Sequence, residues 1–162
     1  VSYASTDLCG NQAVAEQMME MNVGSMGQWG VPGGIVPPST SSGSSLADGY
    51  HQDMARDMLN YVNAARAEEG LNALVWDDSL EELAKRRAQE IVSNFSHDGC
   101  PGYAGENILK KVNDVTSVEA AHVFWMNSPG HRANIMLPEY TRIGISCYTS
   151  GGINWWVENF MY

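Results

Sequence analysis

The first strong apolar pattern lies between about residues 48 and 69. Its members recur at the spacing i, i+4, i+7, i+8 and i+11, and they are Met54, Met58, Tyr61, Val62 and Ala65. This spacing places them in one stripe, which predicts an amphipathic helix packed against a core. Gly70 follows the pattern directly and favours a left-handed helix end there. An extended segment is expected over residues 71–76.

Two further helices are predicted downstream. The second begins near Asp77 or Asp78, because acidic side chains complement the positive end of a helix. Its core-facing residues are Leu80, Leu83, Ala84, Ala88 and Ile91. The third begins at Thr116, which is expected to form a capping box with Glu119. Its buried residues are Val118, Ala121 and Trp125.

Shorter patterns complete the expected elements. Ser128 and Pro129 predict the cap and the first position of a short helical turn. Strands are predicted over about residues 107–110, 141–148 and 153–160, and the glycine-bearing segment between the last two predicts a hairpin turn. Three helices and a small antiparallel sheet together predict a layered α/β fold.

The first 45 residues differ from the rest of the chain. Asn11 is a candidate cap for a short helix over residues 11–21, and residues 30–45 are rich in Pro, Gly and Ser, as is typical of a linker. We therefore divide the chain into an N-terminal extension, residues 1–45, and one domain, residues 46–162. Because the chain begins at Val1 and shows no leader pattern, we expect that a signal peptide has been removed or that the chain has been shortened.

Charge and hydropathy argue against two classes of partner. The formal net charge is −10, and the first of only nine Lys and Arg residues is Arg56. Such a surface repels a phosphate backbone and lacks a polybasic patch, so neither nucleic acid nor an anionic membrane surface is an expected partner. No stretch approaches the roughly 20 apolar residues of a membrane-spanning helix.

The chain contains three cysteines, Cys9, Cys100 and Cys147. An odd number gives no complete disulfide framework, and without a CxxC pair a thiolate zinc site is not expected. Two alternatives stay open for the later pair. Cys100 and Cys147 form a disulfide, which suits an oxidising compartment, or both are buried thiols. With such a disulfide, Cys9 has no partner in the chain or pairs with a second chain.

Histidines and a carboxylate mark the segments in which chemistry is expected. Of four histidines, His97 and His131 lie in polar, glycine-bearing segments, where functional residues concentrate. Glu106, followed by Asn107, opens a predicted strand between them. Imidazole and carboxylate groups serve acid–base catalysis and metal binding alike, although the chain has no HExxH motif. His122 is expected on the surface of the third helix.

Several motifs, in order along the chain, resemble the bacterial branch of the CAP superfamily, which takes in cysteine-rich secretory proteins, antigen 5 and plant pathogenesis-related proteins. They are Phe95-Ser96-His97, Gly105-Glu106-Asn107-Ile108, Trp125-Met126-Asn127-Ser128-Pro129-Gly130-His131-Arg132-Ala133-Asn134-Ile135, Gly144-Ile145 and Trp156-Val157-Glu158-Asn159-Phe160. The resemblance covers about residues 46–162. It implies a three-layer α-β-α sandwich, an extracellular or cell-surface location and a central cleft. In the family that cleft holds two histidines and two acidic residues, and in some members it binds a divalent metal.

Carried over by motif, His97, Glu106 and His131 match three of these four residues. The fourth position, three residues after the helix tryptophan, holds Ser128 where the family has a glutamate. The resemblance therefore implies a cleft with His97, Glu106 and His131 as candidate ligands for zinc or another divalent metal, with Ser128 and Asn107 beside them. Ser128 is expected mainly to cap its helix, and the positive helix end is expected to keep His131 neutral.

Three functions stay open. The leading hypothesis is a secreted, non-enzymatic binding module whose cleft holds a divalent metal, a small ligand or a peptide, because no credible nucleophile accompanies the histidines. The first alternative is a metal-assisted hydrolase of peptides or esters with Glu106 as general base. The second is lipid or sterol binding, which some eukaryotic relatives show. Contact of residues 1–45 with the cleft, in the same chain or in a second one, is a further hypothesis.

Overall fold

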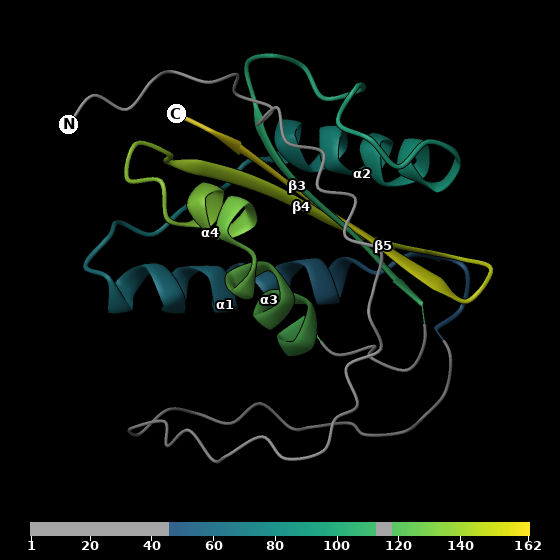
Figure 1. Cartoon of the computed structure of the whole chain (residues 1–162), viewed down its shortest axis with the longest axis horizontal. Coiled ribbons are helices and arrows are strands. Elements are labelled where there is room, and N and C mark those ends of the chain that lie inside the picture. Colours follow the sequence, from purple (N-terminus) through teal and green to yellow (C-terminus); the bar gives the residue numbers. More distant parts are fainter. Residues whose placement is uncertain (1–45, 113–117) are drawn as a thin grey trace.

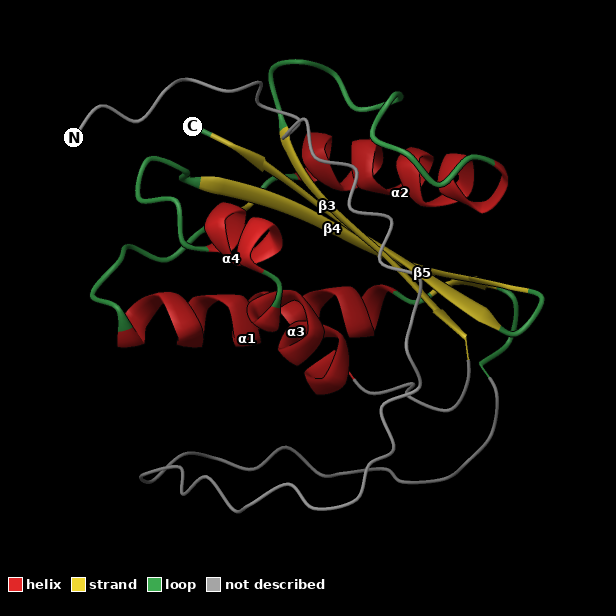
Figure 2. Ribbon diagram, in the orientation of Figure 1, coloured by secondary structure: helices red, strands yellow, loops and turns green. Residues whose placement is uncertain are grey.

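The computed structural model describes residues 46–112 and 118–162. Its elements are β1 (Gly49–Tyr50), α1 (Gln52–Glu68), β2 (Val75–Trp76), α2 (Asp78–Ser93), β3 (Gly105–Val112), α3 (Val118–Asn127), α4 (Pro129–Ile135), β4 (Arg142–Ser150) and β5 (Ile153–Met161). Helix α2 covers one side of the sheet, and α1, α3 and α4 cover the other (Figures 1 and 2). The predicted α-β-α sandwich is confirmed. The extension over residues 1–45 and the expected cap Thr116 lie outside the described residues.

The sheet places strand β3 at one edge. The strand order is β1-β4-β5-β3, and the short β2 pairs in parallel with β4 outside this path. Strands β4 and β5 form the predicted hairpin, whose turn contains Gly151 and Gly152 at φ of 58° and 75°. Positive φ values of this kind suit glycine. Because β3 pairs only with β5, its outer side is left for contacts with helices and loops.

Two apolar layers fill the spaces between the sheet and the helices. The larger one joins α1, α3 and α4 to the sheet and includes Met58, Trp125, Ile143 and Trp156. The smaller one joins α2 to β3 and β5 through residues that include Ala88 and Trp155. The alternation of each strand sends successive side chains into opposite layers, so neighbouring residues of β3 and β5 serve different faces of the sheet.

Helix α2 is positioned by its cap and by a close approach to β4. The side chain of Asp77 accepts hydrogen bonds from the backbone N–H groups of Ser79 and Leu80, as predicted for the start of this helix. All five residues predicted to face the core are buried. A Cβ atom added at Gly144 would lie 2.1 Å from backbone atoms of Leu80 and Glu81. Only glycine therefore lets the first turn of α2 lie directly on β4.

Arg66 holds the segment that follows α4. Its guanidinium is buried and donates hydrogen bonds to the backbone carbonyls of Asn72, Ile135, Leu137 and Tyr140. A buried arginine needs such acceptors, because its charge cannot be lost by deprotonation. The C-terminal end of α4 and the turn after it are thereby fixed to α1.

The structure corrects two expectations and limits a third. No disulfide joins Cys100 to Cys147, since Cys147 lies in the layer under α1 whereas Cys100 packs on the α2 side with Leu80 and Leu83. His122 is not on the surface: it is buried beside Tyr61, with ring centroids 5.7 Å apart. Its burial lowers its pKa to about 4. None of the described helices is long and apolar enough to span a membrane.

Candidate functional site

The candidate site is organised by two neighbouring residues on each of two paired strands. Glu106 of β3 lies opposite Asn159 of β5, and Asn107 lies opposite Glu158. The pleat turns Glu106 and Asn159 toward α2, and Asn107 and Glu158 toward α4. We call these four residues the polar square. Each of its two faces carries one glutamate, one asparagine and contacts to one histidine segment.

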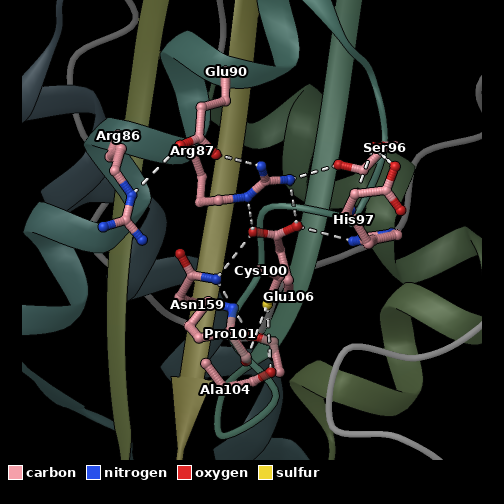
Figure 3. A network of polar contacts seen from close by, with 12 residues as sticks. Arg86, Arg87, Glu90, Ser96, His97, Cys100, Pro101, Ala104, Glu106 and Asn159 are labelled. Atoms are coloured by element: carbon pink, nitrogen blue, oxygen red, sulfur yellow. Dashed lines mark hydrogen bonds and ion pairs between the residues drawn. The ribbon is translucent and has the colours of Figure 1, made fainter.

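On the α2 face, the carboxylate of Glu106 accepts hydrogen bonds from three side chains (Figure 3). Arg87 reaches both oxygens, with Nε 2.8 Å from Oε2 and Nη2 3.1 Å from Oε1. Nδ1 of His97 lies 2.9 Å from Oε1, and Nδ2 of Asn159 lies 3.2 Å from Oε2. The guanidinium also contacts Glu90 and the backbone carbonyl of Ser96, which ties the loop carrying His97 to α2.

These contacts keep Glu106 ionised although its side chain has no exposed surface. Burial alone would raise the pKa of this carboxyl, but hydrogen bonds from His97 and Arg87, together with the charge of Arg87, outweigh burial and hold the pKa below its ordinary value. Because an ionised carboxylate only accepts hydrogen bonds, Nδ1 of His97 carries the hydrogen. The other ring nitrogen, Nε2, then has a free lone pair when the ring is neutral.

On the α4 face, Asn107 connects the strands to the helix. Its Nδ2 group donates to Oε2 of Glu158 at 3.0 Å and to the backbone carbonyl of His131 at 3.1 Å. Its Oδ1 atom accepts from Nδ2 of Asn134 at 2.9 Å, and the same amide donates to the backbone carbonyl of Glu106. Asn134 therefore occupies part of the outer side of β3, and Asn107 fixes the position of His131.

Glu158 and His131, which lie on this face, are both neutral near pH 7. Burial raises the pKa of the Glu158 carboxyl to about 8, an effect that the hydrogen bond from Asn107 only partly offsets. Burial also lowers the pKa of His131 to about 4, and the nearby charge of protonated His97 lowers it further. The expectation of a neutral His131 is confirmed, but burial is the first cause, where the sequence pointed to the helix end. The influence of His97 shows that the two imidazoles lie within electrostatic range.

The chain resembles known proteins over this whole region. The model of the cysteine-rich secretory protein family, CAP, matches residues 59–160. The chain belongs to this family. The Bacillus subtilis protein YkwD is 31% identical over 140 residues, which cover 76% of this chain and 51% of YkwD. The chain thus spans about half the length, or less, of the first curated bacterial relatives that it matches.

Solved structures support the CAP fold. An extracellular protein from Bacillus anthracis that contains an SCP domain is 25% identical, with a TM-score of 0.57 over 68% of this chain and 40% of that one. The structure of NaASP2 with Zn²⁺ is 14% identical, with a TM-score of 0.59 over 72% of this chain and 83% of that one. At 14% identity the likeness to NaASP2 concerns the fold alone.

The structure brings most of the predicted CAP site residues together. Glu106 contacts His97 directly, and Asn107 contacts the backbone of His131. Ser128 is at the N-cap of α4, as predicted, but its side chain makes no capping hydrogen bond. The predicted residues thus form two adjoining clusters, one on each face of β3.

Four further residues were not predicted as site residues, although the last three stand in the quoted family motifs: Arg87, Asn134, Glu158 and Asn159. A signal existed for three of them. Arg87 stands within the apolar stripe of α2, next to Ala88, and Glu158 with Asn159 interrupts the apolar sequence of β5. A polar residue at a core position needs a partner. Asn134 lies in a polar segment, and nothing in the pattern distinguished it from its neighbours.

The three-ligand metal site predicted from sequence fits this geometry poorly. Both oxygens of Glu106 already accept hydrogen bonds from Arg87, His97 and Asn159. Within residues 46–112 and 118–162, no group of three or more His, Cys, Asp or Glu side chains is arranged to hold a metal ion. Metal binding stays a prediction, and the donors left for it are the two imidazoles. Glu106 would then orient His97 as its hydrogen-bonded partner.

Proposed function

We propose that this CAP domain is an extracellular, non-enzymatic binding domain that presents His97 and His131 to a ligand. Glu106 turns the free Nε2 lone pair of His97 away from the carboxylate, and Asn107 fixes the backbone of His131. Neutral imidazoles with free lone pairs accept hydrogen bonds and bind transition-metal ions. The ligand classes are those expected from sequence, namely a divalent metal, a small polar ligand or a peptide.

One observation carries this proposal: Arg87, His97 and Asn159 all donate hydrogen bonds to the buried carboxylate of Glu106. A general base must reach the proton it removes and must bind it near the working pH. Glu106 has no exposed side-chain surface, three donors hold its oxygens, and its pKa lies below the ordinary value. The carboxylate is therefore suited to orient an imidazole and poorly suited to activate water, which weakens the hydrolase that relies on Glu106.

The extracellular location is inferred from the proteins that the chain resembles. The family is that of cysteine-rich secretory proteins, and the similar protein from Bacillus anthracis is described as extracellular. Export would be measured by fractionation of cells that make the full-length protein, with the domain expected outside the cytoplasm.

Calorimetry with zinc tests the metal form of the proposal. We expect Zn²⁺ to release binding heat with the unchanged domain and none with the double variant His97→Ala/His131→Ala. His51→Ala is the matched control, because His51 bonds Thr149 on the far side of β4 and takes no part in the site. Equal heats from the double variant and the unchanged domain, or no heat from either, would exclude zinc as the ligand.

A second candidate function rests on the contact between Glu106 and His97. A carboxylate bonded to Nδ1 fixes the tautomer and orientation of the ring, as in acid–base catalysis by histidine. If the domain is a hydrolase, His97 is then the base and Glu106 its orienting partner. Screening of peptide and ester substrates with His97→Gln and Glu106→Gln tests this: turnover that His97→Gln leaves unchanged excludes the mechanism. No observation in the described residues favours lipid or sterol binding, which stays a prediction.

A further inference from the structure

We propose that Glu158 is a positioning residue for His131 and acts through Asn107. The inference rests on the proposed function, because it assigns a device that holds one of the two presented imidazoles. It assigns a role to a carboxyl group outside the four cleft residues that the CAP resemblance implies, entering the site from strand β5.

The contacts form a short chain from the sheet to the helix. Oε2 of Glu158 accepts from the Asn107 amide at 3.0 Å, and the same nitrogen donates to the backbone carbonyl of His131 at 3.1 Å. Both hydrogens of one amide group are thereby used, one for the sheet and one for α4. Without an acceptor at Glu158, Nδ2 of Asn107 loses its partner on the sheet, and the Asn107 side chain is held only by its two contacts to α4, with the His131 carbonyl and with Asn134.

Ser128 does not supply this support. It lies at the N-cap of α4, and its side chain makes no capping hydrogen bond. The other end of α4 is held by Arg66 through the carbonyl of Ile135. Glu158 and Asn107 thus hold the backbone of His131 from the strand side, while the ring of Phe124 on α3 lies beside its imidazole, with centroids 6.5 Å apart.

Within residues 46–112 and 118–162, no cation pairs with Glu158. Its Oε1 atom is buried and has no hydrogen-bond partner among the described residues. The charged or titratable groups on the elements over this face include His131 and Arg132 on α4, His122 on α3, Arg66 on α1 and Lys111 on β3. None of these five makes an ion pair or hydrogen bond with the Glu158 carboxyl. The neutral acid is therefore the form that suits this place.

The neutral acid also explains the contrast between the two histidines. His97 bonds an anion, Glu106, with Nδ1 2.9 Å from Oε1. His131 has a neutral acid beneath it, so nothing opposes the effect of burial on its ring. When Glu158 ionises, at a pH near 8, a buried anion appears next to Asn107. We expect the amide and the His131 segment to rearrange as this happens.

The test compares Glu158→Gln, which keeps a neutral acceptor of the same shape, with Glu158→Leu, which keeps the size and removes the acceptor. Glu139→Gln, a change at an exposed glutamate just after α4, is the matched control. The readout is the NMR signal of the His131 ring, followed from pH 6 to pH 10 in the domain without ligand, with circular dichroism to verify folding.

We expect the unchanged domain and the control to show an alkaline transition of the His131 signal near pH 8. Glu158→Gln should keep the neutral-pH signal and lose the transition, whereas Glu158→Leu should shift the signal at every pH. A transition that persists in Glu158→Gln overturns the proposal. So does a folded Glu158→Leu variant whose His131 signal is unchanged.

This readout separates the inference from the proposed function, since it requires no ligand. If zinc binds, Glu158→Leu should weaken its affinity about 10-fold to 100-fold, as removal of a residue behind a metal ligand does, and Glu158→Gln should leave the affinity at pH 7 unchanged. If zinc releases no heat, the metal form of the proposed function fails, while the NMR result still decides the role of Glu158.

Discussion

The two faces of the polar square contain the same kinds of residue but opposite charge states. Glu106 and Glu158 are both almost fully buried, each beside an asparagine, on strands that pair directly. Glu106 faces Arg87 and is an anion, with a pKa below the ordinary value. Glu158 faces an amide alone, and its pKa is raised to about 8. Glu106 has a hydrogen-bonded imidazole and a guanidinium as partners, and Glu158 has neither, so these partners decide which glutamate is charged.

The comparison shows why one face contains the charged network and the other does not. A buried carboxylate is stable only with a cation and several donors, and α2 supplies them through Arg87. Helix α4 supplies only backbone carbonyls and an asparagine to the opposite face. The two imidazoles therefore differ in their surroundings: His97 has an anion as its hydrogen-bond partner, and His131 has none.

Loss of the cation should have the largest effect. Arg87→Met leaves Glu106 buried without its main partner, and such a loss costs about 3–5 kcal/mol of the free energy of unfolding. Arg86→Met is the control, since Arg86 is exposed and its ion pair with Glu90 is long, at 3.5 Å, so we expect a change of about 0.5 kcal/mol or less. Urea denaturation at pH 7 measures both.

Removal of the uncompensated charge of Glu106 should then restore part of the unfolding free energy that Arg87→Met loses. The double variant Arg87→Met/Glu106→Gln is expected to be more stable than Arg87→Met alone, because no buried anion remains. If the double variant is no more stable, the charge of Glu106 is not what Arg87 compensates, and the contrast between the faces has another cause.

The pH dependence of stability should distinguish the second glutamate. The folded state holds the Glu158 proton up to about pH 8, against an ordinary value of 4.5. Between these values the unfolded chain binds fewer protons, so the free energy of unfolding falls as pH rises, by up to about 1.4 kcal/mol per pH unit. Glu158→Gln should remove this slope. Glu106→Gln should act on the acid side instead, because stability from a lowered pKa is lost as pH falls below the ordinary value.

Denaturation at pH 5, 6, 7 and 8 measures these slopes. The difference in unfolding free energy between Glu158→Gln and the unchanged domain should grow steadily over this range. A difference that stays constant with pH would show that Glu158 is ionised in the folded state, and the two faces would then be alike.

The two asparagines should report on different histidines. Asn107→Ala removes donors to Glu158 and to the backbone of His131, and Asn159→Ala removes a donor to Glu106. Each change should cost about 1–3 kcal/mol, because buried partners lose a hydrogen bond. NMR should show the His131 signals shifted by Asn107→Ala and the His97 signals shifted by Asn159→Ala. Equal shifts of both histidines in both variants would show that the two faces are coupled and do not act separately.

The smallest effect should come from the helix caps. Asp77→Ala removes two hydrogen bonds at the start of α2, and we expect a loss of about 1 kcal/mol. Ser128→Ala removes no capping bond from α4, so a loss below about 0.5 kcal/mol is expected. Thermal denaturation of both variants checks this, and a larger loss from Ser128→Ala would assign α4 a support that the structure does not show.

Much of the fold followed from periodicity along the sequence. The five apolar positions of α2 are all buried, and the Asp77 cap and the β4–β5 hairpin lie where the pattern placed them. These features depend on spacing within one segment, which a sequence displays directly. The prediction that His122 is exposed was wrong, because its environment is set by α1, where Tyr61 packs against it.

The site followed only in part, because its partners come from distant segments. His97, Glu106 and His131 were found through family motifs. Arg87 lies outside those motifs, and the contact of Glu158 with Asn107 was not expected from the motif that contains it. The register that sets Asn107 opposite Glu158 is a property of strand pairing, and no local pattern encodes it. The charge state of each glutamate depends in turn on that register and on the helix above it.

Arg66 has a consequence for how selective the domain is. By binding the carbonyls of Ile135 and Leu137 it makes helix α4, the wall that carries His131, rigid before any ligand arrives. The conformational freedom of that wall is lost when the chain folds, so association does not have to remove it. A rigid wall also cannot adapt its shape, and closely related ligands should therefore differ widely in affinity.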